Sequence, residues 1–168
     1  RKVMFTNTII ICTSNAGAAS IFEAVESGED IEKDTLLSEL FKKGLVDLSK
    51  RGKMNFYRLN LENPLVRQFK VTQTIAEING LIDQLKSASN RVILFGSCAE
   101  GIDSQDSDID LAVISQNADE VRRVIGKYRM TREIQPLIFH SGEFMVLEKR
   151  DKPLYERISK GIVLWRRA

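Results

Sequence analysis

The chain has 168 residues, of which 43% are hydrophobic and 29% are charged, an ordinary composition for a soluble globular protein with room for two small domains. Its net charge of +2 excludes a general electrostatic attraction to nucleic acid, so any such contact must come from a local patch. Two distant cysteines, Cys12 and Cys98, and one histidine, His140, argue against a disulfide framework and a usual zinc site, and favour a reducing, cytoplasmic compartment.

The first element is an apolar, β-branched stretch, residues 4–13, which predicts a buried strand. Ser14-Asn15-Ala16-Gly17 ends it, and the apolar spacing of the next residues predicts a helix that ends near Gly28. The apolar run at 8–12 is far shorter than the roughly 20 residues that cross a bilayer, so we expect no membrane association.

A second helix is predicted at about 31–43, with Gly44 as its stop, and a β-hairpin follows it. The segment "ELFKKGLVDLSKRGKMNFYRLN" resembles the recognition-helix end and wing of a winged helix-turn-helix domain. In that interpretation the hairpin tip would contact the backbone of duplex DNA through Lys50, Arg51 and Lys53.

Charge around this hairpin supports two opposite interpretations. Residues 42–58 carry six basic side chains and one acidic, a net +5, whereas residues 23–39 carry seven acidic and one basic, a net −6. The acidic stretch would repel phosphate, and it is equally typical of a solvated helix face. DNA binding is therefore one open alternative.

A long helix is predicted after Asn63-Pro64, with apolar residues three and four apart up to Leu85. The polar segment 87–90 ends it. We therefore expect an N-terminal region at 1–61, a linking helix at 62–89 and a second domain at 90–168.

Strands and helices alternate after residue 90. Strands are predicted at 91–95, 109–115 and 132–139, with helices near 121–128, 142–149 and 153–160. A last apolar segment, 162–165, is predicted to be an edge strand or a docking tail.

The candidate chemistry lies between the first two of these strands. A hydrophobic strand ends in Gly96-Ser97, and after ten intervening residues a second strand begins with Asp108 and Asp110, which strand alternation places on one face. Two adjacent carboxylates repel unless a cation lies between them, and hard oxygen ligands suit Mg²⁺. Gly96 permits close approach of a phosphate, and the N–H groups of a helix that opens at Ser97 favour an anion.

Each piece alone has an ordinary explanation. Gly-Ser is a common turn, and Asp-x-Asp is usually a solvated strand end or a helix cap, as we expect for Asp103 and Asp106. Only their combination at this spacing between two apolar strands predicts a nucleotidyl- or phosphoryl-transfer site.

The segment "LFGSCAEGIDSQDSDIDLAVIS" closely resembles the signature of the polymerase-β-like nucleotidyltransferases, in particular the minimal domains, over about residues 90–140. The resemblance implies an α+β fold, a mixed sheet flanked by helices, here preceded by the winged-helix-like region and the long helix. It assigns the triphosphate, most simply ATP, to Gly96 and Ser97 and the Mg²⁺ (or Mn²⁺) to Asp108 and Asp110. It also implies transfer of a nucleoside monophosphate to a hydroxyl acceptor of a protein, an RNA or a small molecule. Minimal members often work beside a helical partner protein that supplies part of the nucleotide pocket, and such a partner is one candidate acceptor.

Active members of that family carry a third acidic residue on a later strand. Here Glu133 and Gln135 share one face of the third strand, and either could be directed at Asp108 and Asp110. We favour Glu133 as the third catalytic carboxylate, the alternative being a surface residue. Glu100 stands where many relatives carry a basic residue, which counts against turnover but not against the fold.

The first 35 residues carry a separate resemblance. "RKVMFTNTIIICTSNAGAASIFEAVESGEDIEK" is similar to the sensor-1 segment of Clp-type AAA+ ATPases, with Asn15 as the sensor asparagine. No GxxxxGK[ST] loop is present, so we transfer no ATPase function to it. A fusion or chimera, or a replacement of the first winged-helix helices, would each explain it.

The preferred hypothesis is thus a Mg²⁺-dependent nucleotidyltransferase. The alternative is a DNA-binding or regulatory module whose transferase domain binds nucleotide without turnover.

Overall fold

A computed structural model describes residues 33–51, 54–104 and 106–167. The strand predicted at 4–13, the helix after it and the residues of the AAA+ resemblance up to 32 lie outside these ranges. The chain divides into two compact units, Arg1–Val66 and Arg67–Ala168, which are described separately.

The first unit contains the predicted helix and hairpin. Helix α2 (Lys33–Lys42) is followed by Gly44, whose φ of 66° is the left-handed conformation that favours glycine, and the Leu45 N–H donates to the Leu40 carbonyl at 2.9 Å. Strands β1 (Val46–Arg51) and β2 (Met54–Leu59) pair antiparallel. The helix and the hairpin share a small core, which is formed by Leu40, Leu45, Val46 and Val66.

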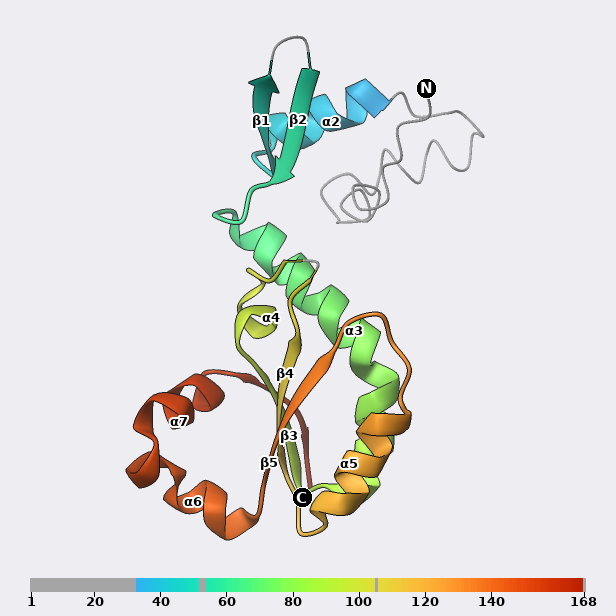
Figure 1. The fold of residues 1–168 in the computed structure, drawn as a ribbon. Coiled ribbons are helices and arrows are strands. Elements are labelled where there is room, and N and C mark those ends of the chain that lie inside the picture. The colour runs from blue at the N-terminus through green and yellow to red at the C-terminus, as the bar shows by residue number, and fades with distance from the viewer. Residues whose placement is uncertain (1–32, 52–53, 105, 168) are drawn as a thin grey trace. The chain divides into compact units, whose positions relative to one another are not determined.

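The second unit is built on a four-stranded mixed sheet in the order β5-β4-β3-β6 (Figure 1). Strand β3 (Arg91–Phe95) pairs antiparallel with β4 (Ile109–Ile114) and with β6 (Ile162–Arg166), while β5 (Ile134–Phe139) pairs parallel with β4. The predicted α+β fold class with a mixed sheet is confirmed. Segment 162–165, left open between strand and tail, belongs to the edge strand β6.

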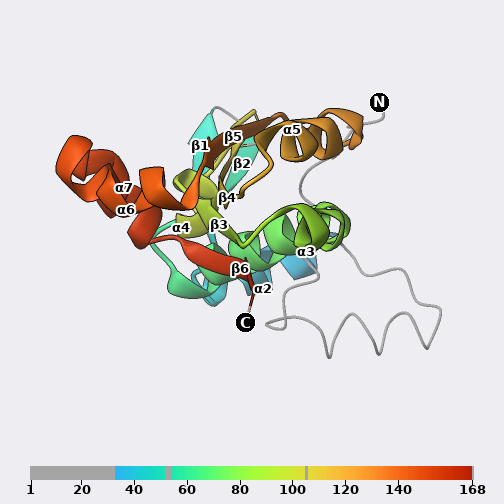
Figure 2. The same ribbon diagram turned by 90° about the horizontal axis from the view of Figure 1, so that it is seen from below.

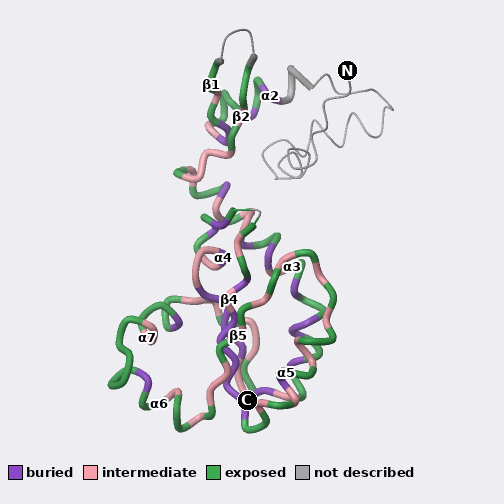
Figure 3. The backbone as a smooth tube through the Cα atoms, viewed as in Figure 1, coloured by how far each residue is buried: buried purple, intermediate pink, exposed green. Residues whose placement is uncertain are grey.

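Helices cover both faces of this sheet (Figure 2). Helices α3 (Pro64–Ala88) and α5 (Ala118–Lys127) pack on one face, and α6 (Ser141–Arg150) and α7 (Lys152–Ser159) pack on the other. The short helix α4 (Ser97–Glu100) follows β3 directly. Strands β3 and β4 are buried almost throughout, in agreement with their apolar sequences, in which Arg91 and Asp110 are the charged residues (Figure 3).

Helix α3 is the element that the sequence presents as a linker between domains. In the structure its apolar stripe, including Ile78, Leu81 and Leu85, is fully buried against the sheet. The compact units divide between Val66 and Arg67, so most of α3 belongs to the second unit, and the division at residue 90 stays a prediction. None of the helices in the described residues is both long enough and apolar enough to span a membrane.

Candidate functional site

The turn after β3 brings the backbone against a carboxylate. Gly96 has φ 72° and ψ −158°, a conformation that side-chain-bearing residues rarely adopt, and it leads straight into α4 at Ser97. A Cβ atom at this position would collide with the Asp110 carboxylate. Glycine is therefore required here both for its dihedral angles and for the space that Asp110 occupies.

Asp110 lies at the start of β4, between the end of β3 and the start of β5. It pairs with Phe95 on one side and with Gln135 on the other, and its side chain is 30% exposed. Paired residues on adjacent strands project from the same face, and Phe95 packs on the face covered by α6 and α7. The Asp110 carboxylate therefore lies where the α6/α7 face becomes accessible to solvent.

Asp108 lies two residues before Asp110 and is exposed. Ile109, between them, is fully buried on the opposite face in the core under α3 and α5. The Asp108 charge acts on Asp110, so the two carboxylates lie near one another, and a shared face for them stays a prediction from alternation.

The electrostatics of this pair favour a cation. Partial burial raises the pKa of Asp110 above its ordinary value, the nearby Arg157 guanidinium opposes that rise, and the Asp108 carboxylate adds to it. The residues of the chain therefore do not fully balance the negative charge of Asp110. Oxygen donors in that condition fit a hard divalent cation.

The third predicted carboxylate, Glu133, lies directly before the neighbouring strand β5. Its carbonyl accepts a hydrogen bond from the Ile109 N–H at 2.8 Å, and Gln135, not Glu133, pairs directly with Asp110. The Gln135 Nε2 donates to the Glu133 carboxylate at 3.4 Å, so the two side chains lie together, both exposed. Across the parts of the chain that the structure describes, no group of three or more His, Cys, Asp or Glu side chains is placed to hold a metal ion.

A buried ionic cluster that sequence reasoning missed lies beside the segment between α4 and Asp108. Asp103, which is only 7% exposed, lies 3.2 Å from the Lys70 Nζ and 3.3 Å from an Arg132 Nη2. The Arg132 Nε also donates to the Ser107 carbonyl at 3.0 Å, directly before Asp108. The expectation that Asp103 is a solvated strand end is wrong, because Lys70 on α3 and Arg132 before β5 enclose it.

Cys98 connects this cluster to the backbone of Asp108. Its thiol is buried, receives a hydrogen bond from Arg132 at 2.8 Å and donates to the Asp108 carbonyl at 3.3 Å. Burial raises the pKa of the Cys98 thiol, although Arg132 opposes the rise, so the sulfur keeps its proton for this donation. Cys98 thus has a structural role rather than that of a nucleophile.

Arg157 is a further charged residue at the site that sequence reasoning missed. It extends from α7, with one Nη atom 4.0 Å from the Asp110 carboxylate and its Cζ 5.6 Å from the centre of the Phe95 ring. Nothing in the sequence singles out one basic residue of a surface helix, because the approach depends on how α7 packs on the sheet.

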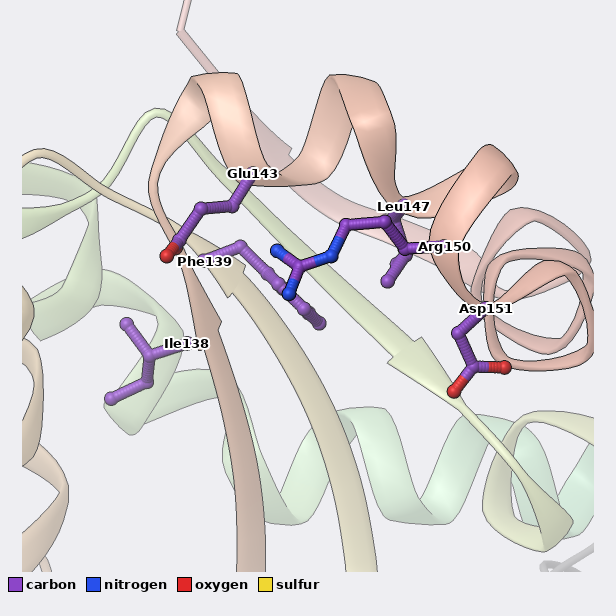
Figure 4. A pocket seen from close by; sticks show the side chains of 6 residues that line it. All are labelled: Ile138, Phe139, Glu143, Leu147, Arg150 and Asp151. Carbon is purple, nitrogen blue, oxygen red and sulfur yellow. The ribbon is translucent and has the colours of Figure 1, made fainter.

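A cavity of about 400 Å³ lies farther along the same face, between β5 and the junction of α6 and α7. It is lined by Ile138, Phe139, Glu143, Leu147, Arg150 and Asp151, and the Arg150 side chain reaches back toward Phe139 (Figure 4). Neither Asp108 nor Asp110 lines it, so this cavity is separate from the carboxylate pair.

The predicted DNA-contacting residues belong to the first unit. Lys50 is exposed on β1. Arg51 ends that strand with its side chain undescribed, and Lys53 lies outside the described residues. The resemblance to a wing therefore remains a prediction.

In the structure, the Gly96 turn contacts Asp110 of strand β4. Comparison with protein families identifies the same region. The family model for "Polymerase beta, Nucleotidyltransferase" matches residues 77–168, more than half of the chain. The chain belongs to the polymerase-β nucleotidyltransferase family.

The nucleotidyltransferase match begins at residue 77 and so includes the C-terminal half of α3, where Ile78, Leu81 and Leu85 pack on the sheet. The chain is also similar to a solved protein from Sulfolobus solfataricus that is itself assigned only provisionally as a nucleotidyltransferase. That similarity has 15% identity and a TM-score of 0.38, and covers 61% of this chain and 85% of the other. No curated protein matches the sequence.

Proposed function

We propose that this nucleotidyltransferase domain is a Mg²⁺-dependent enzyme (Mn²⁺ serving equally) that transfers a nucleoside monophosphate, most simply from ATP, to a hydroxyl acceptor. The observation that carries the proposal is the Asp110 carboxylate, half-buried beside a like charge and packed against the Gly96 turn. Such a pair is stabilised by a divalent cation.

Asp108 and Asp110 would hold the metal, which when bound would neutralise charge on the phosphates. Gly96 would let the triphosphate approach the backbone closely, and the Ser97 end of α4 would offer N–H groups to it. Because α4 is a single turn, hydrogen bonding rather than a helix dipole would supply this contact.

In the reaction, the acceptor oxygen forms a bond to the α-phosphorus while the bond to the bridging oxygen breaks and pyrophosphate leaves. The acceptor hydroxyl loses its proton, for which Glu133 is the proposed base. Glu133 is solvent-exposed directly before β5, one strand away from the carboxylate pair, so an incoming acceptor could reach it. Its contact with Gln135 would hold it on the face that carries Asp110.

A thermal-shift experiment tests the nucleotide site. Mg²⁺ with a nonhydrolysable ATP analogue should raise the melting temperature of the full chain, and Asp108→Asn/Asp110→Asn should abolish that increase. Glu148→Gln, which changes an exposed carboxylate of α6, is the matched control and should keep the increase. An undiminished increase in the double variant would show that the site lies elsewhere.

The acceptor is proposed to be a hydroxyl of a separate helical protein. Incubation with labelled ATP, followed by mass spectrometry of captured partners, should find a nucleoside monophosphate attached to one of them. If the intact protein binds the triphosphate but modifies no partner, the regulatory alternative without turnover replaces the enzymatic one. The free, buried thiol of Cys98 agrees with a reducing, cytoplasmic compartment, which we propose on that ground.

DNA binding by the first unit is the second candidate, favoured by its antiparallel hairpin with Lys50 exposed. Replacing Lys50, Arg51 and Lys53 with Glu should abolish duplex-DNA affinity and its dependence on salt concentration. Gel-shift behaviour unchanged by these replacements, or no DNA binding by the intact chain, would exclude this function.

A further inference from the structure

Arg157 approaches the carboxylate pair from a firmly anchored helix. The next residue, Ile158, is fully buried against the sheet, and Asp151 caps the start of α7 by accepting from the Leu154 N–H at 3.1 Å. The Arg157 side chain itself is 61% exposed. Its backbone is thus fixed beside the site while its guanidinium can change partner.

The contact between Arg157 and Asp110 adds little to the stability of the fold. Its 4.0 Å separation is at the limit of an ion pair, and solvent screens a guanidinium that is mostly exposed. The arrangement also leaves Arg157 to balance two carboxylates, since Asp108 lies beside Asp110. A purely structural role would be better served by the close, buried contacts that Arg132 makes with Asp103.

The chemistry of the group fits a phosphate. A guanidinium keeps its charge at all physiological pH values and presents five N–H donors in a planar fork that matches phosphate oxygens. Among the described residues, Asp110 is the carboxylate that lies within ion-pair distance of Arg157. A cation that binds the Asp110 oxygens would therefore free the Arg157 guanidinium to pair with another anion at the same place.

We propose that Arg157 is a phosphate-binding residue of the nucleotide site that exchanges partners on binding. In the free protein it neutralises part of the charge on Asp110. When a divalent cation and a triphosphate occupy the site, Arg157 pairs with phosphate oxygens of the triphosphate instead. This inference rests on the proposed nucleotide site, which it extends by a residue from α7.

The exchange has a consequence that a structural role would not have. Without Arg157, a divalent cation alone has no competitor for Asp110 and binds more tightly. The same loss removes a charge-assisted hydrogen bond to the triphosphate, which then binds more weakly. The two affinities should therefore change in opposite directions, whereas local damage to the site would weaken both.

Isothermal titration of the full chain tests this, first with Mg²⁺ alone and then with a nonhydrolysable ATP analogue at saturating Mg²⁺. For Arg157→Ala we expect the dissociation constant of the analogue to rise about tenfold and that of Mg²⁺ alone to fall. Arg157→Lys keeps the charge but not the fork and should give intermediate values. Lys160→Ala removes an exposed positive charge three residues farther on and should change neither constant by more than about twofold.

The outcomes separate this inference from the proposed function. If the wild type binds the analogue through Asp108 and Asp110 but Arg157→Ala binds it equally well, the role of Arg157 is refuted and the nucleotide site stands. A parallel change of both constants in Arg157→Ala and Arg157→Lys would also refute the exchange. If the wild type binds no triphosphate, the inference and the proposed function both fail.

Discussion

Asp103 and Asp110 lie seven residues apart in one segment, yet they differ in burial and in the positive charge that surrounds them. Asp103 has a side chain only 5% exposed and two cationic partners, Lys70 at 3.2 Å and Arg132 at 3.3 Å. Asp110 is 30% exposed and has one mostly solvated partner, Arg157, at 4.0 Å. Proteins compensate a buried charge that serves the fold, so a carboxylate pair left short of positive charge is the better candidate for a ligand site.

The largest effect should come from breaking the compensated cluster. Arg132→Met leaves the buried Asp103 with one cation and frees the Ser107 and Cys98 contacts, so we expect the free energy of unfolding to fall by about 3 kcal/mol. Chemical denaturation measures this, with Arg129→Met, an exposed position nearby, as the control. Asp103→Asn combined with Arg132→Met should lose less than the sum of the two single variants. Stability equal to wild type in Arg132→Met would show that the cluster does not support the fold.

The next largest effect is expected at Glu133, the proposed third carboxylate of the site. If Glu133 takes the acceptor proton, Glu133→Gln should lower the transfer rate by about 10² while leaving nucleotide affinity within a few-fold of wild type. Single-turnover transfer of labelled nucleotide to the partner measures both. Gln135→Ala, the neighbouring change beside Asp110, serves as the comparison. A Glu133→Gln rate equal to that of the wild type would leave Glu133 as a surface residue.

A smaller effect is expected at the turn that touches Asp110. Gly96→Ala introduces a side chain where φ is 72° and where a Cβ would displace the Asp110 carboxylate, so it should cost about 2 kcal/mol of stability. It should also abolish the ligand-induced rise in melting temperature. Gly142→Ala, where a Cβ would meet no atom within 4 Å, is the matched control. Normal nucleotide binding by Gly96→Ala would place the phosphates away from this turn.

The smallest effect concerns the protonation of Asp110 itself. Because burial raises the pKa of Asp110 in the folded state, ionisation of Asp110 destabilises the fold as pH rises from its ordinary pKa of 3.8 to the raised one. Asp110→Asn should therefore be more stable than wild type at pH 7, by less than about 1 kcal/mol after solvent screening. Denaturation at pH 7 and at pH 3 should show the difference shrinking in acid. A destabilised Asp110→Asn at pH 7 would mean that Arg157 already compensates the charge.

The motif could be predicted from the sequence because its parts are local. A glycine after a strand and two aspartates on alternate residues define a face before any tertiary contact is known, and in the structure the Asp108 charge acts on Asp110. Alternation also predicts one face for Glu133 and Gln135, whose side chains contact each other in the structure. It could not decide which of them lies opposite Asp110, because that depends on the register of β5 against β4, which a long crossover connection does not encode locally.

The compensating charges could not be predicted, for a related reason. Lys70, Asp103 and Arg132 are far apart in the chain and meet only when α3 packs on the sheet. Each of them, taken alone, has the sequence pattern of a solvated surface residue. Arg157 is equally inconspicuous among the basic residues of the C-terminal helices, and only its approach to Asp110 distinguishes it.

The most direct test of the central claim is an anomalous difference map from crystals of the full chain grown with Mn²⁺ and a nonhydrolysable ATP analogue. The account predicts a Mn²⁺ peak about 2 Å from carboxylate oxygens of both Asp108 and Asp110, with the triphosphate beside Gly96. A triphosphate-bound Mn²⁺ peak that contacts neither carboxylate would contradict it.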